Sequence, residues 1–380
     1  MKIKDICTSV TDGSHNPPQV IEKSEYMMLS SKNIFDDEIT FDEPRFLSEK
    51  DFEREHKRTQ IAVGDVLLTI VGTVGRTAVV DEDMPAFALQ RSVAVLHPKN
   101  DICLPRFLMY ALRGKRTYIE NRAKGVAQKG IYLKEVSDID IYIPDISNQE
   151  IIINKLDKVN TIIKLRQEEL LALDNLIKAR FVEMFGDPVS NSYGFPEATL
   201  PELGELGRGV SKHRPRNDSK LLGGDYPLIQ TGDVANAGLY ITSYGGTYSE
   251  LGLKQSKMWN KGTLCITIAA NIAKTAILEF DACFPDSVVG FIANEKTNNI
   301  FIHYWFSFFQ AILESQAPES AQKNINLKIL SELKVIVPKK EKQDEFVEFI
   351  EQVYKSKVAV QKALDETQML FDSLMQEYFN

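Results

Sequence analysis

Four residues near the start of the chain have types and spacing similar to a known reaction site. Asn16 to Gln19 read "NPPQ", close to the Asn-Pro-Pro-aromatic motif with which amino-methyltransferases hold the exocyclic amine of a flipped base. In that motif the aromatic side chain stacks on the base, and here Gln19 stands in its place. The sequence also lacks a Gly-rich turn between strand and helix for a methyl-donor cofactor. We therefore interpret the string as part of a turn-rich loop in which Ser14, His15 and Asn16 are recognition residues.

Two other strings suggest chemistry but lack a required residue. Pro285-Asp286 followed by Glu295-Lys296 is similar to a nuclease site, but the residue needed between the acid and the lysine is missing. The string "GTVGR" at 72–76 does not have the GxxxxGK[ST] spacing of a phosphate-binding loop. The five histidines and four cysteines show no paired spacing of metal ligands. We expect no catalytic residue, no metal site and no cofactor.

Charge is unevenly distributed along the chain. The formal net charge of −8 argues against a free-standing DNA binder, because most such domains carry a basic face. Two stretches are nevertheless basic, the first containing only Glu120 as an acid and the second only Asp218. They comprise Arg106, Arg113, Lys115, Arg116, Arg122, Lys124, Lys129 and Lys134, and then Arg208, Lys212, Arg214, Arg216 and Lys220. Each stretch is either an anion-binding surface or a solvated face, and charge alone does not separate these interpretations.

Length and composition are typical of a two-domain globular protein. The 380 residues exceed one small core, and 43% hydrophobic with 26% charged residues is an ordinary composition for a soluble chain. No apolar run approaches the roughly 20 residues that a membrane span needs. The start "MKIKDICTSV" lacks the apolar core of a signal peptide. We expect a cytoplasmic protein with no membrane partner.

The sequence contains an internal repeat with a period of about 195 residues, so the repeating unit is a domain. Three blocks recur in the same order. They are "YMMLSSKNI" from Tyr26 with "YPLIQTGDV" from Tyr226, "GDVLLTIVGTVGRTAVV" at 64–80 with "GTLCITIAANIAKTAIL" at 262–278, and "AQKGIYLKEVSDIDIYIP" at 127–144 with "AQKNINLKILSELKVIVP" at 321–338. The apolar runs between Gly, Pro and Asp predict strands. Helices are expected from about Arg106 to Arg122 and from about Ile302 to Ser315.

Each domain is followed by a heptad pattern, in which apolar residues alternate steps of 4 and 3 over about five repeats. The first seam consists of Ile152, Leu156, Val159, Ile163, Leu170, Leu173 and Ile177, and the second of Phe346, Ile350, Val353, Val360, Leu364, Phe371, Leu374 and Tyr378. Each helix should contain about 38 residues and measure about 57 Å. Arg166, Lys357 and Thr367 interrupt the seams. They either fix the register of the helices or lie at the edge of a seam that is slightly misassigned.

Connectivity sets the direction of these helices. The first leads from domain one to domain two, so the second can pack on it only by running back, which predicts an antiparallel coiled coil with pseudo-two-fold symmetry. The fold class is α+β. The expected ranges are 1–146 for the first domain, 147–186 for the first helix, 187–340 for the second domain and 341–380 for the second helix.

These features together resemble the specificity subunit of type I restriction-modification systems, and the resemblance covers essentially the whole chain. Its most specific parts are the duplicated "AQK" segments, the paired heptad helices, "RFVEMFGDP" at 180–188 and "LIQTGDV" at 228–234. The resemblance implies a non-catalytic subunit whose two target recognition domains each read half of an interrupted site in double-stranded DNA. It also implies that the helices act as a spacer and dock two methyltransferase subunits, and that motor-nuclease subunits join for cleavage.

Candidate DNA contacts follow from the basic stretches and the loops. They are Ser14, His15, Asn16, Arg76, Arg91, Arg122, Lys124, Lys129, Lys212, Arg214, Arg216, Lys274 and Lys323. For Lys129 and Lys323, and for the adjacent Gln128 and Gln322, capping and turn formation before a strand is an equally open role. A stand-alone DNA methyltransferase or nuclease with its own recognition domains is the competing function, and the missing cofactor and acid-cluster motifs count against it. A purely structural coiled-coil scaffold is a second rival, against which the duplicated domains and basic stretches argue.

Overall fold

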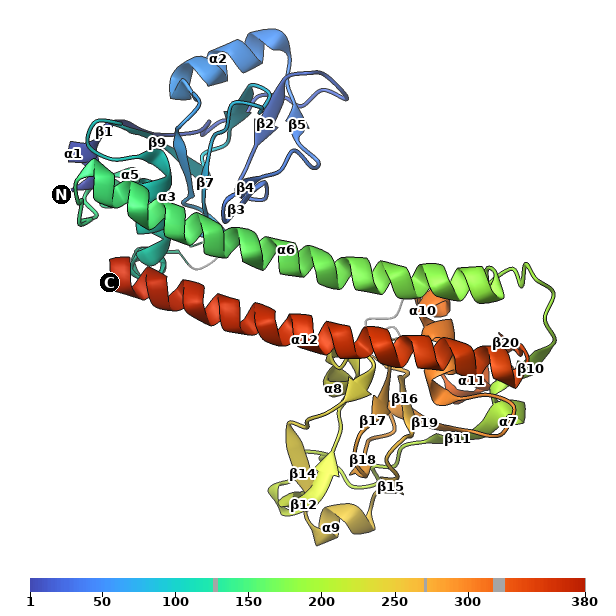
Figure 1. The fold of residues 1–380 in the computed structure, drawn as a ribbon. Coiled ribbons are helices and arrows are strands. Elements are labelled where there is room, and N and C mark those ends of the chain that lie inside the picture. The colour runs from blue at the N-terminus through green and yellow to red at the C-terminus, as the bar shows by residue number, and fades with distance from the viewer. Residues whose placement is uncertain (126–128, 270–271, 317–324, 380) are drawn as a thin grey trace. The chain divides into compact units, whose positions relative to one another are not determined.

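The computed structural model describes residues 1–125, 129–269, 272–316 and 325–379. The chain forms two compact units, which we call unit 1 (Met1–Gln167 with Gln361–Asn380) and unit 2 (Glu168–Val360). Each unit combines β-sheets with helices, so the predicted α+β class is confirmed (Figure 1). In the described part of the chain, no helix has both the length and the apolar character needed to span a membrane.

Unit 1 is built on an antiparallel sheet with strand order β1-β9-β6-β7. A second sheet has the order β5-β2-β8, and β3 pairs with β4 in a hairpin. The strands are β1 (Cys7–Asp12), β2 (Met27–Leu29), β3 (Ile34–Phe35), β4 (Glu38–Ile39), β5 (Arg45–Phe46), β6 (Val66–Thr69), β7 (Thr77–Val79), β8 (Phe87–Leu89) and β9 (Val93–Pro98). The short helices are α1 (Ile3–Ile6), α2 (Glu49–Thr59), α3 (Pro105–Gly114), α4 (Arg116–Arg122) and α5 (Leu133–Ser137).

Unit 2 repeats this plan with a central sheet of order β11-β19-β16-β17-β13. A second sheet has the order β14-β12-β18-β15, and β10 pairs with β20. The strands are β10 (Glu197–Thr199), β11 (Gly204–Arg208), β12 (Leu222–Leu228), β13 (Tyr240–Ile241), β14 (Gly246–Tyr248), β15 (Met258–Trp259), β16 (Leu264–Thr267), β17 (Thr275–Leu278), β18 (Ala282–Cys283), β19 (Val288–Ala293) and β20 (Lys334–Ile336). The helices are α7 (Leu200–Leu203), α8 (Thr231–Asn236), α9 (Glu250–Lys254), α10 (Asn299–Gln316) and α11 (Leu327–Glu332), with a 3₁₀ turn at Ser219–Leu221.

The repeated sequence blocks make equivalent contacts in the two units. The Ile131 N–H donates to the Ile70 carbonyl at 2.9 Å, and the Ile325 N–H donates to the Ile268 carbonyl at 3.0 Å. Both bonds join the end of the "AQK" segment to the loop that follows the central strand, β6 or β16. A segment that ties the end of each domain to its central sheet is needed in both copies, which explains why its sequence is shared.

The single helix expected from Arg106 to Arg122 is wrong in one respect, because α3 ends at Gly114 and α4 begins at Arg116. Lys115 between them has φ −91° and ψ 10°, outside helical geometry. A Cβ atom on Gly114 would lie 2.5 Å from the Cβ atom of Phe379. The side chain of Phe379 thus requires glycine at this position, and its packing accompanies the break.

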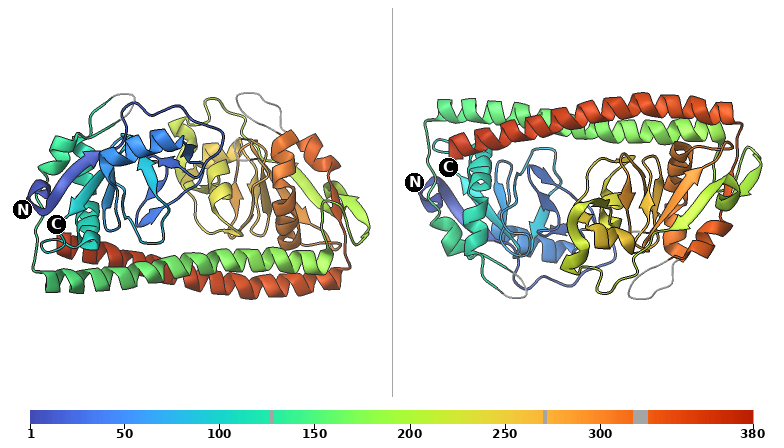
Figure 2. Two further views of the ribbon diagram at one scale, coloured as in Figure 1. Left: turned by 90° about the horizontal axis from the view of Figure 1, so that it is seen from above. Right: turned by 90° about the horizontal axis from the view of Figure 1, so that it is seen from below.

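Two long helices contribute to both units, α6 (Ile146–Phe185) and α12 (Lys340–Phe379). In unit 1 the Lys155 ammonium donates to the Tyr378 hydroxyl at 3.1 Å, near the start of α6 and the end of α12. In unit 2 the Arg180 guanidinium pairs with Glu345 at 2.8 Å, near the end of α6 and the start of α12. Within each unit the two helices therefore run antiparallel, as predicted (Figure 2).

The seam residues of both helices face their partners. Leu156, Ile163, Ile177, Phe346, Ile350, Val353 and Phe371 are buried, and Ile152, Val159, Leu170, Leu173, Val360, Leu364, Leu374 and Tyr378 are half-buried. The seams also include Phe181, Phe185, Met375 and Phe379, buried residues that the heptad assignment did not contain. Of the interrupting residues, Lys357 pairs with Asp174, and the buried Nη1 of Arg166 has no hydrogen-bond partner among the described residues.

A buried glutamine fixes the start of each long helix. The Gln149 amide donates to the carbonyls of Ile102 and Pro144 and accepts from the Leu104 N–H, all at 2.8–2.9 Å. The Gln343 amide donates to the carbonyls of Lys296 and Pro338 and accepts from the Thr297 hydroxyl. Both side chains are fully buried, and a buried amide is stable only when its donors and acceptors are paired.

Candidate nucleic-acid interface

Five loops of unit 1 meet on one surface, which we call loop face 1: residues 12–16, 29–31, 70–72, 90–92 and 129–131. Hydrogen bonds between loops hold it together. The Arg91 N–H donates to the Ser14 carbonyl at 3.0 Å, and the Gly72 N–H donates to the Lys129 carbonyl at 3.0 Å. The Ser31 N–H donates to the Ser92 hydroxyl at 3.0 Å. Because hydrogen bonds join loops that are far apart in sequence, loop face 1 is a preorganised surface.

Loop face 1 contains a hollow of about 300 Å³ that is lined by both polar and apolar residues. Its polar lining comes from Asp12, His15, Arg91, Lys124 and Tyr132, and Ile70, Val71, Gly130, Ile131 and Leu133 complete it. His15 Nε2 lies 2.7 Å from Asp12 Oδ2.

 The Arg91 side chain is exposed and has no partner among the described residues. A guanidinium that is free above a rigid turn can donate two parallel hydrogen bonds to a base edge or a phosphate.

The other predicted contacts of unit 1 divide into exposed and engaged residues. Arg122 is exposed and stacks over the Tyr118 ring at 4.6 Å, whereas Arg76 is half-buried and stacks over Phe35 at 4.9 Å. Asn16, Lys124 and Lys129 are exposed. Ser14 is buried, with only 4% of its surface exposed. Its backbone joins the sheet edge beside Gln90, which turns the hydroxyl inward.

Part of the first basic stretch has a structural role that charge counting did not reveal. Arg106 donates three hydrogen bonds to the Asp157 carboxylate, at 2.7–3.0 Å. Arg116 pairs with Asp36. Arg113 is half-buried over the Tyr110 ring at 5.3 Å, and desolvation lowers the pKa of its guanidinium. These three arginines hold unit 1 together. Of the other five basic residues in the stretch, Lys124 lines the hollow of loop face 1 and Lys129 belongs to one of its loops.

The predicted contacts of unit 2 lie in a different charge environment. Arg216 pairs with Asp286, and Arg214 lies 3.6 Å from the same carboxylate. The Lys212 side chain is exposed, and the Lys212 backbone N–H donates to Gln255 Oε1 at 2.7 Å. Lys274 is directed towards α10, where its ammonium donates to Gln310 at 3.1 Å. Lys323, like Gln128 and Gln322, lies outside the described residues.

The sequence analysis missed that two pairs of equivalent positions in the two units carry opposite charges. The Gly13 N–H donates to the Val93 carbonyl, and the Gly209 N–H donates to the Val288 carbonyl, so these positions are equivalent. The residue before each glycine is Asp12 in unit 1 and Arg208 in unit 2. Two residues before each of the valines stand Arg91 and Asp286. Aligning "DGS" with "RGV" and "QRSV" with "PDSV" would have revealed this exchange.

The possible metal ligands and the cysteines of the described residues do not form a cluster. No cluster of three or more His, Cys, Asp or Glu residues suited to a metal ion occurs among them. The four cysteines are free and buried. Burial raises the pKa of the Cys7 and Cys103 thiols to about 12, so neither forms a thiolate at neutral pH.

The chain thus combines a duplicated α+β unit with two paired long helices. Residues 1–175 and 197–367 match the family model "Type I restriction modification DNA specificity domain". The chain belongs to this family and is the DNA specificity subunit of a type I restriction-modification system. As a specificity subunit it is the non-catalytic, DNA-binding part of that complex.

Two curated relatives share sequence with the chain. One is the type I restriction enzyme EcoBI specificity subunit of Escherichia coli, 28% identical over 159 residues, which cover 40% of this chain and 33% of that protein. The other is the putative type I restriction enzyme MjaX specificity subunit of Methanocaldococcus jannaschii, 22% identical over 359 residues, which cover 90% of this chain and 83% of that protein. The chain thus aligns with only a third of the first relative and with most of the second.

Two solved structures share the fold. The S subunit of a type I restriction-modification system from M. genitalium has a TM-score of 0.60 and 15% identity, and the match covers 100% of this chain and 95% of that one. A chain from a study of complex assembly and conformational transition of the type I system has a TM-score of 0.57 and 16% identity, with 100% and 97% covered. At these identities the likeness concerns the fold alone.

Proposed function

We propose that each unit reads one half of a bipartite, interrupted site in double-stranded DNA. The observation that carries this proposal is that equivalent loop positions of the two units have opposite charges. Arg91 in unit 1 corresponds to Asp286 in unit 2, and Asp12 corresponds to Arg208. An arginine donates to guanine in the major groove, whereas a carboxylate accepts from cytosine. Two units with the same scaffold and opposite charges at equivalent positions are suited to two different half-sites.

Contacts to phosphates and to bases fall to different residues in this proposal. The phosphate contacts are assigned to exposed basic side chains, which position the subunit without reading sequence. They are Arg122, Lys124 and Lys129 in unit 1 and Lys212 in unit 2. His15, Asn16 and Arg91 lie on loop face 1 and read base edges. Arg76, Arg214, Arg216, Lys274 and Lys323 complete the proposed DNA-binding set. Ser14 supports the loop from inside the unit.

The long helices are proposed to set the spacing of the half-sites and to dock two methyltransferase subunits. Motor-nuclease subunits then join this complex for cleavage. The outer faces of these helices carry large exposed apolar side chains, which support a docking role. On α6 they are Ile162, Leu165, Leu171, Leu176 and Val182, and on α12 they are Val358, Met369 and Leu370. We place the assembled complex in the cytoplasm, where cellular DNA is accessible to it.

The test compares the purified chain with the assembled complex. The chain alone should neither methylate nor cut DNA, and methylation should appear when methyltransferase subunits are added. Methylation by the rigorously purified chain would instead support the competing function, a stand-alone DNA methyltransferase with built-in recognition domains.

Charge reversal tests the proposed phosphate contacts. Arg122→Glu with Lys124→Glu should weaken binding of all DNA sequences by the assembled complex and reduce the slope of log K against log salt by about 2, or about 0.9 per lost phosphate contact. Lys50→Glu on α2, an exposed lysine outside loop face 1, is the matched control and should leave the slope unchanged. A changed sequence preference with an unchanged salt slope would show that Arg122 and Lys124 read bases.

A further inference from the structure

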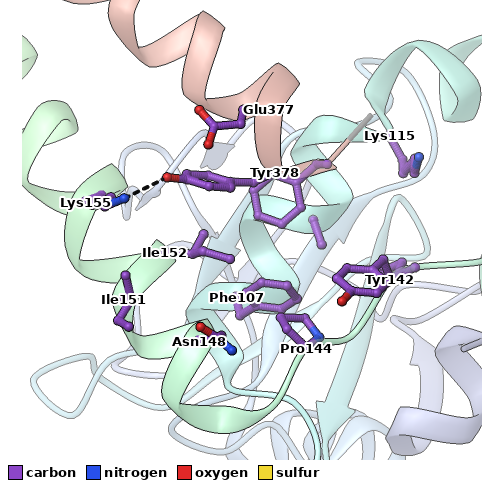
Figure 3. Close-up of a pocket in the computed structure, with 13 residues that line it drawn as sticks. Phe107, Lys115, Tyr142, Pro144, Asn148, Ile151, Ile152, Lys155, Glu377 and Tyr378 are labelled. Carbon is purple, nitrogen blue, oxygen red and sulfur yellow. Dashed lines mark hydrogen bonds between the residues drawn. The ribbon is translucent and has the colours of Figure 1, made fainter.

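A hollow of about 550 Å³ lies in unit 1 where α6 begins, away from loop face 1. Its walls come from α3, from the segment before α6, from the first turns of α6 and from the end of α12 (Figure 3). Phe107, Tyr142, Ile151 and Tyr378 supply aromatic and aliphatic surface. We call this hollow the base groove.

In unit 2 the chain covers the equivalent position with its own residues. After α6 ends at Phe185, the chain turns back, and Phe195 brings its ring to 6.5 Å from the Phe185 ring. The Val337 N–H then donates to the Pro196 carbonyl at 2.7 Å, and β10 pairs with β20 directly afterwards. An extended segment that contains an aromatic residue and a proline therefore fills this place in unit 2.

The two places correspond residue by residue. Phe107 packs on Phe379 in unit 1 with ring centroids 5.4 Å apart, and Phe301 packs on Phe185 in unit 2 at 5.1 Å. The Met1 carbonyl accepts from the Ile141 N–H, as part of a pairing that Ala198 and Val335 repeat in unit 2. In unit 2, Glu197 and Pro196 continue this pairing beside Ile336 and Val337, at the place equivalent to the base groove.

Equivalent residues are more exposed in the base groove than in unit 2. Tyr142 is 78% exposed in the base groove, whereas its equivalent Ile336 in unit 2 is 1% exposed. Pro144 is half-buried and its equivalent Pro338 is buried. The Ile143 N–H, which corresponds to the Val337 N–H, has no backbone acceptor among the described residues. Unit 1 therefore presents both an apolar surface and a free strand edge, the two features required for β-strand addition.

We propose that the base groove binds an extended segment of a partner protein, which adds a strand beside residues 142–143 and places an aromatic side chain near Phe379, the equivalent of Phe185. The groove is lined by Lys115 and Lys155 against the single acid Glu377, so the segment should carry a carboxylate. The segment of unit 2 provides the template, because it combines Phe195 and Pro196 with Glu197. This inference does not depend on how either unit reads DNA.

A labelled peptide, SNSYGFPEA (residues 190–198), is the probe, and its fluorescence anisotropy is measured with the full chain. Saturable binding is expected, and Phe→Ala in the peptide should weaken it at least tenfold. Ile151→Glu in the chain, at a side chain that is 50% exposed, should have the same effect, and so should Tyr142→Asp. Val63→Glu changes an equally exposed side chain outside the groove and should bind like the unaltered chain. Circular dichroism verifies that all three variants are folded.

Three outcomes would overturn the proposal. The first is the absence of saturable binding, and the second is equal binding of the peptide with and without its phenylalanine. The third is a concentration-dependent dimer in sedimentation that Ile151→Glu abolishes, which would assign the base groove to a second copy of this chain.

Discussion

At the scale of single residues, Arg91 combines a rigid backbone with a free guanidinium. Its N–H is held by the Ser14 carbonyl, and the side chain is exposed. Arg91→Gln should change the preferred base at one position of one half-site, since a bidentate arginine contributes about 1–3 kcal/mol of discrimination for guanine. Methylation mapping with the assembled complex measures this change. Lys124→Gln is the control, for which we expect uniform weakening, and the same uniform weakening for Arg91→Gln would show that Arg91 contacts a phosphate.

His303 makes unit 2 sensitive to acid. Burial lowers the pKa of this imidazole to about 4 from its usual 6.5, with Lys357 also lowering it, although the Thr275 hydroxyl lies 2.9 Å from Nδ1. Between about pH 6.5 and 4 the unfolded state therefore binds more protons than the folded state. The free energy of unfolding should fall as pH decreases through this range, by up to about 3 kcal/mol.

The measurement is urea unfolding at pH 7, 6 and 5, followed by tryptophan fluorescence. Both tryptophans, Trp259 and Trp305, belong to unit 2, so the signal reports on that unit. His303→Gln should remove most of the pH dependence, and His15→Gln in unit 1 should not. An unchanged pH dependence in His303→Gln would assign the acid sensitivity to other groups.

At the scale of elements, the start of each long helix depends on one buried glutamine. Gln149→Leu would leave the Leu104 N–H and the carbonyls of Ile102 and Pro144 without their partner. Because each unpaired buried group costs about 1–3 kcal/mol, we expect a loss of at least about 2 kcal/mol in the free energy of unfolding. Glu150→Gln, an exposed neighbour, is the control and should change stability little. Denaturation followed by circular dichroism measures both, and equal stabilities would show that the network is dispensable.

The elements were more predictable from the sequence than the side-chain partners. The heptads predicted the paired helices, because a heptad is a local pattern. The internal repeat predicted the doubled α+β unit, because a repeat is found by comparing the sequence with itself. The roles of Arg106 and Arg116 could not be predicted, since their partners Asp157 and Asp36 are distant in sequence. The burial of Ser14 likewise follows from a tertiary contact. Gln149 did leave a signal, because a glutamine occupies the same position in both copies.

At the scale of the whole molecule, each unit is completed by the end of a long helix. In unit 1, Phe371 and Phe379 of α12 pack on Tyr110 and Phe107, with ring centroids 6.2 and 5.4 Å apart. In unit 2, the end of α6 takes this role, and Phe181 packs on Phe301 at 5.5 Å. Since the ends of the two helices are equivalent, one can be expected to substitute for the other.

A fragment of residues 1–186 tests this equivalence. It retains the fold of unit 1 except for α12, so the apolar surface around Phe107 and Tyr110 would be exposed in a monomer. In a dimer, Ile177, Phe181 and Phe185 of the second copy would occupy the places of Phe371, Met375 and Phe379, which would bury that surface again. Pairing would also use the seam residues Ile152, Leu156, Val159, Ile163 and Leu170. Arg166 would face a symmetry-related neighbourhood near the middle of the pair, at some cost in stability.

The fragment should therefore sediment as a dimer, and Phe181→Glu should make it monomeric while Val63→Glu leaves it dimeric. With methyltransferase subunits, the dimer presents two copies of the first recognition domain and should modify a palindromic interrupted site made of the first half-site and its inverted repeat. Methylation mapping of the fragment complex decides the outcome. A monomeric fragment, or a dimer that modifies an asymmetric site, would mean that the antiparallel helices do not hold two equivalent recognition domains in a two-fold arrangement.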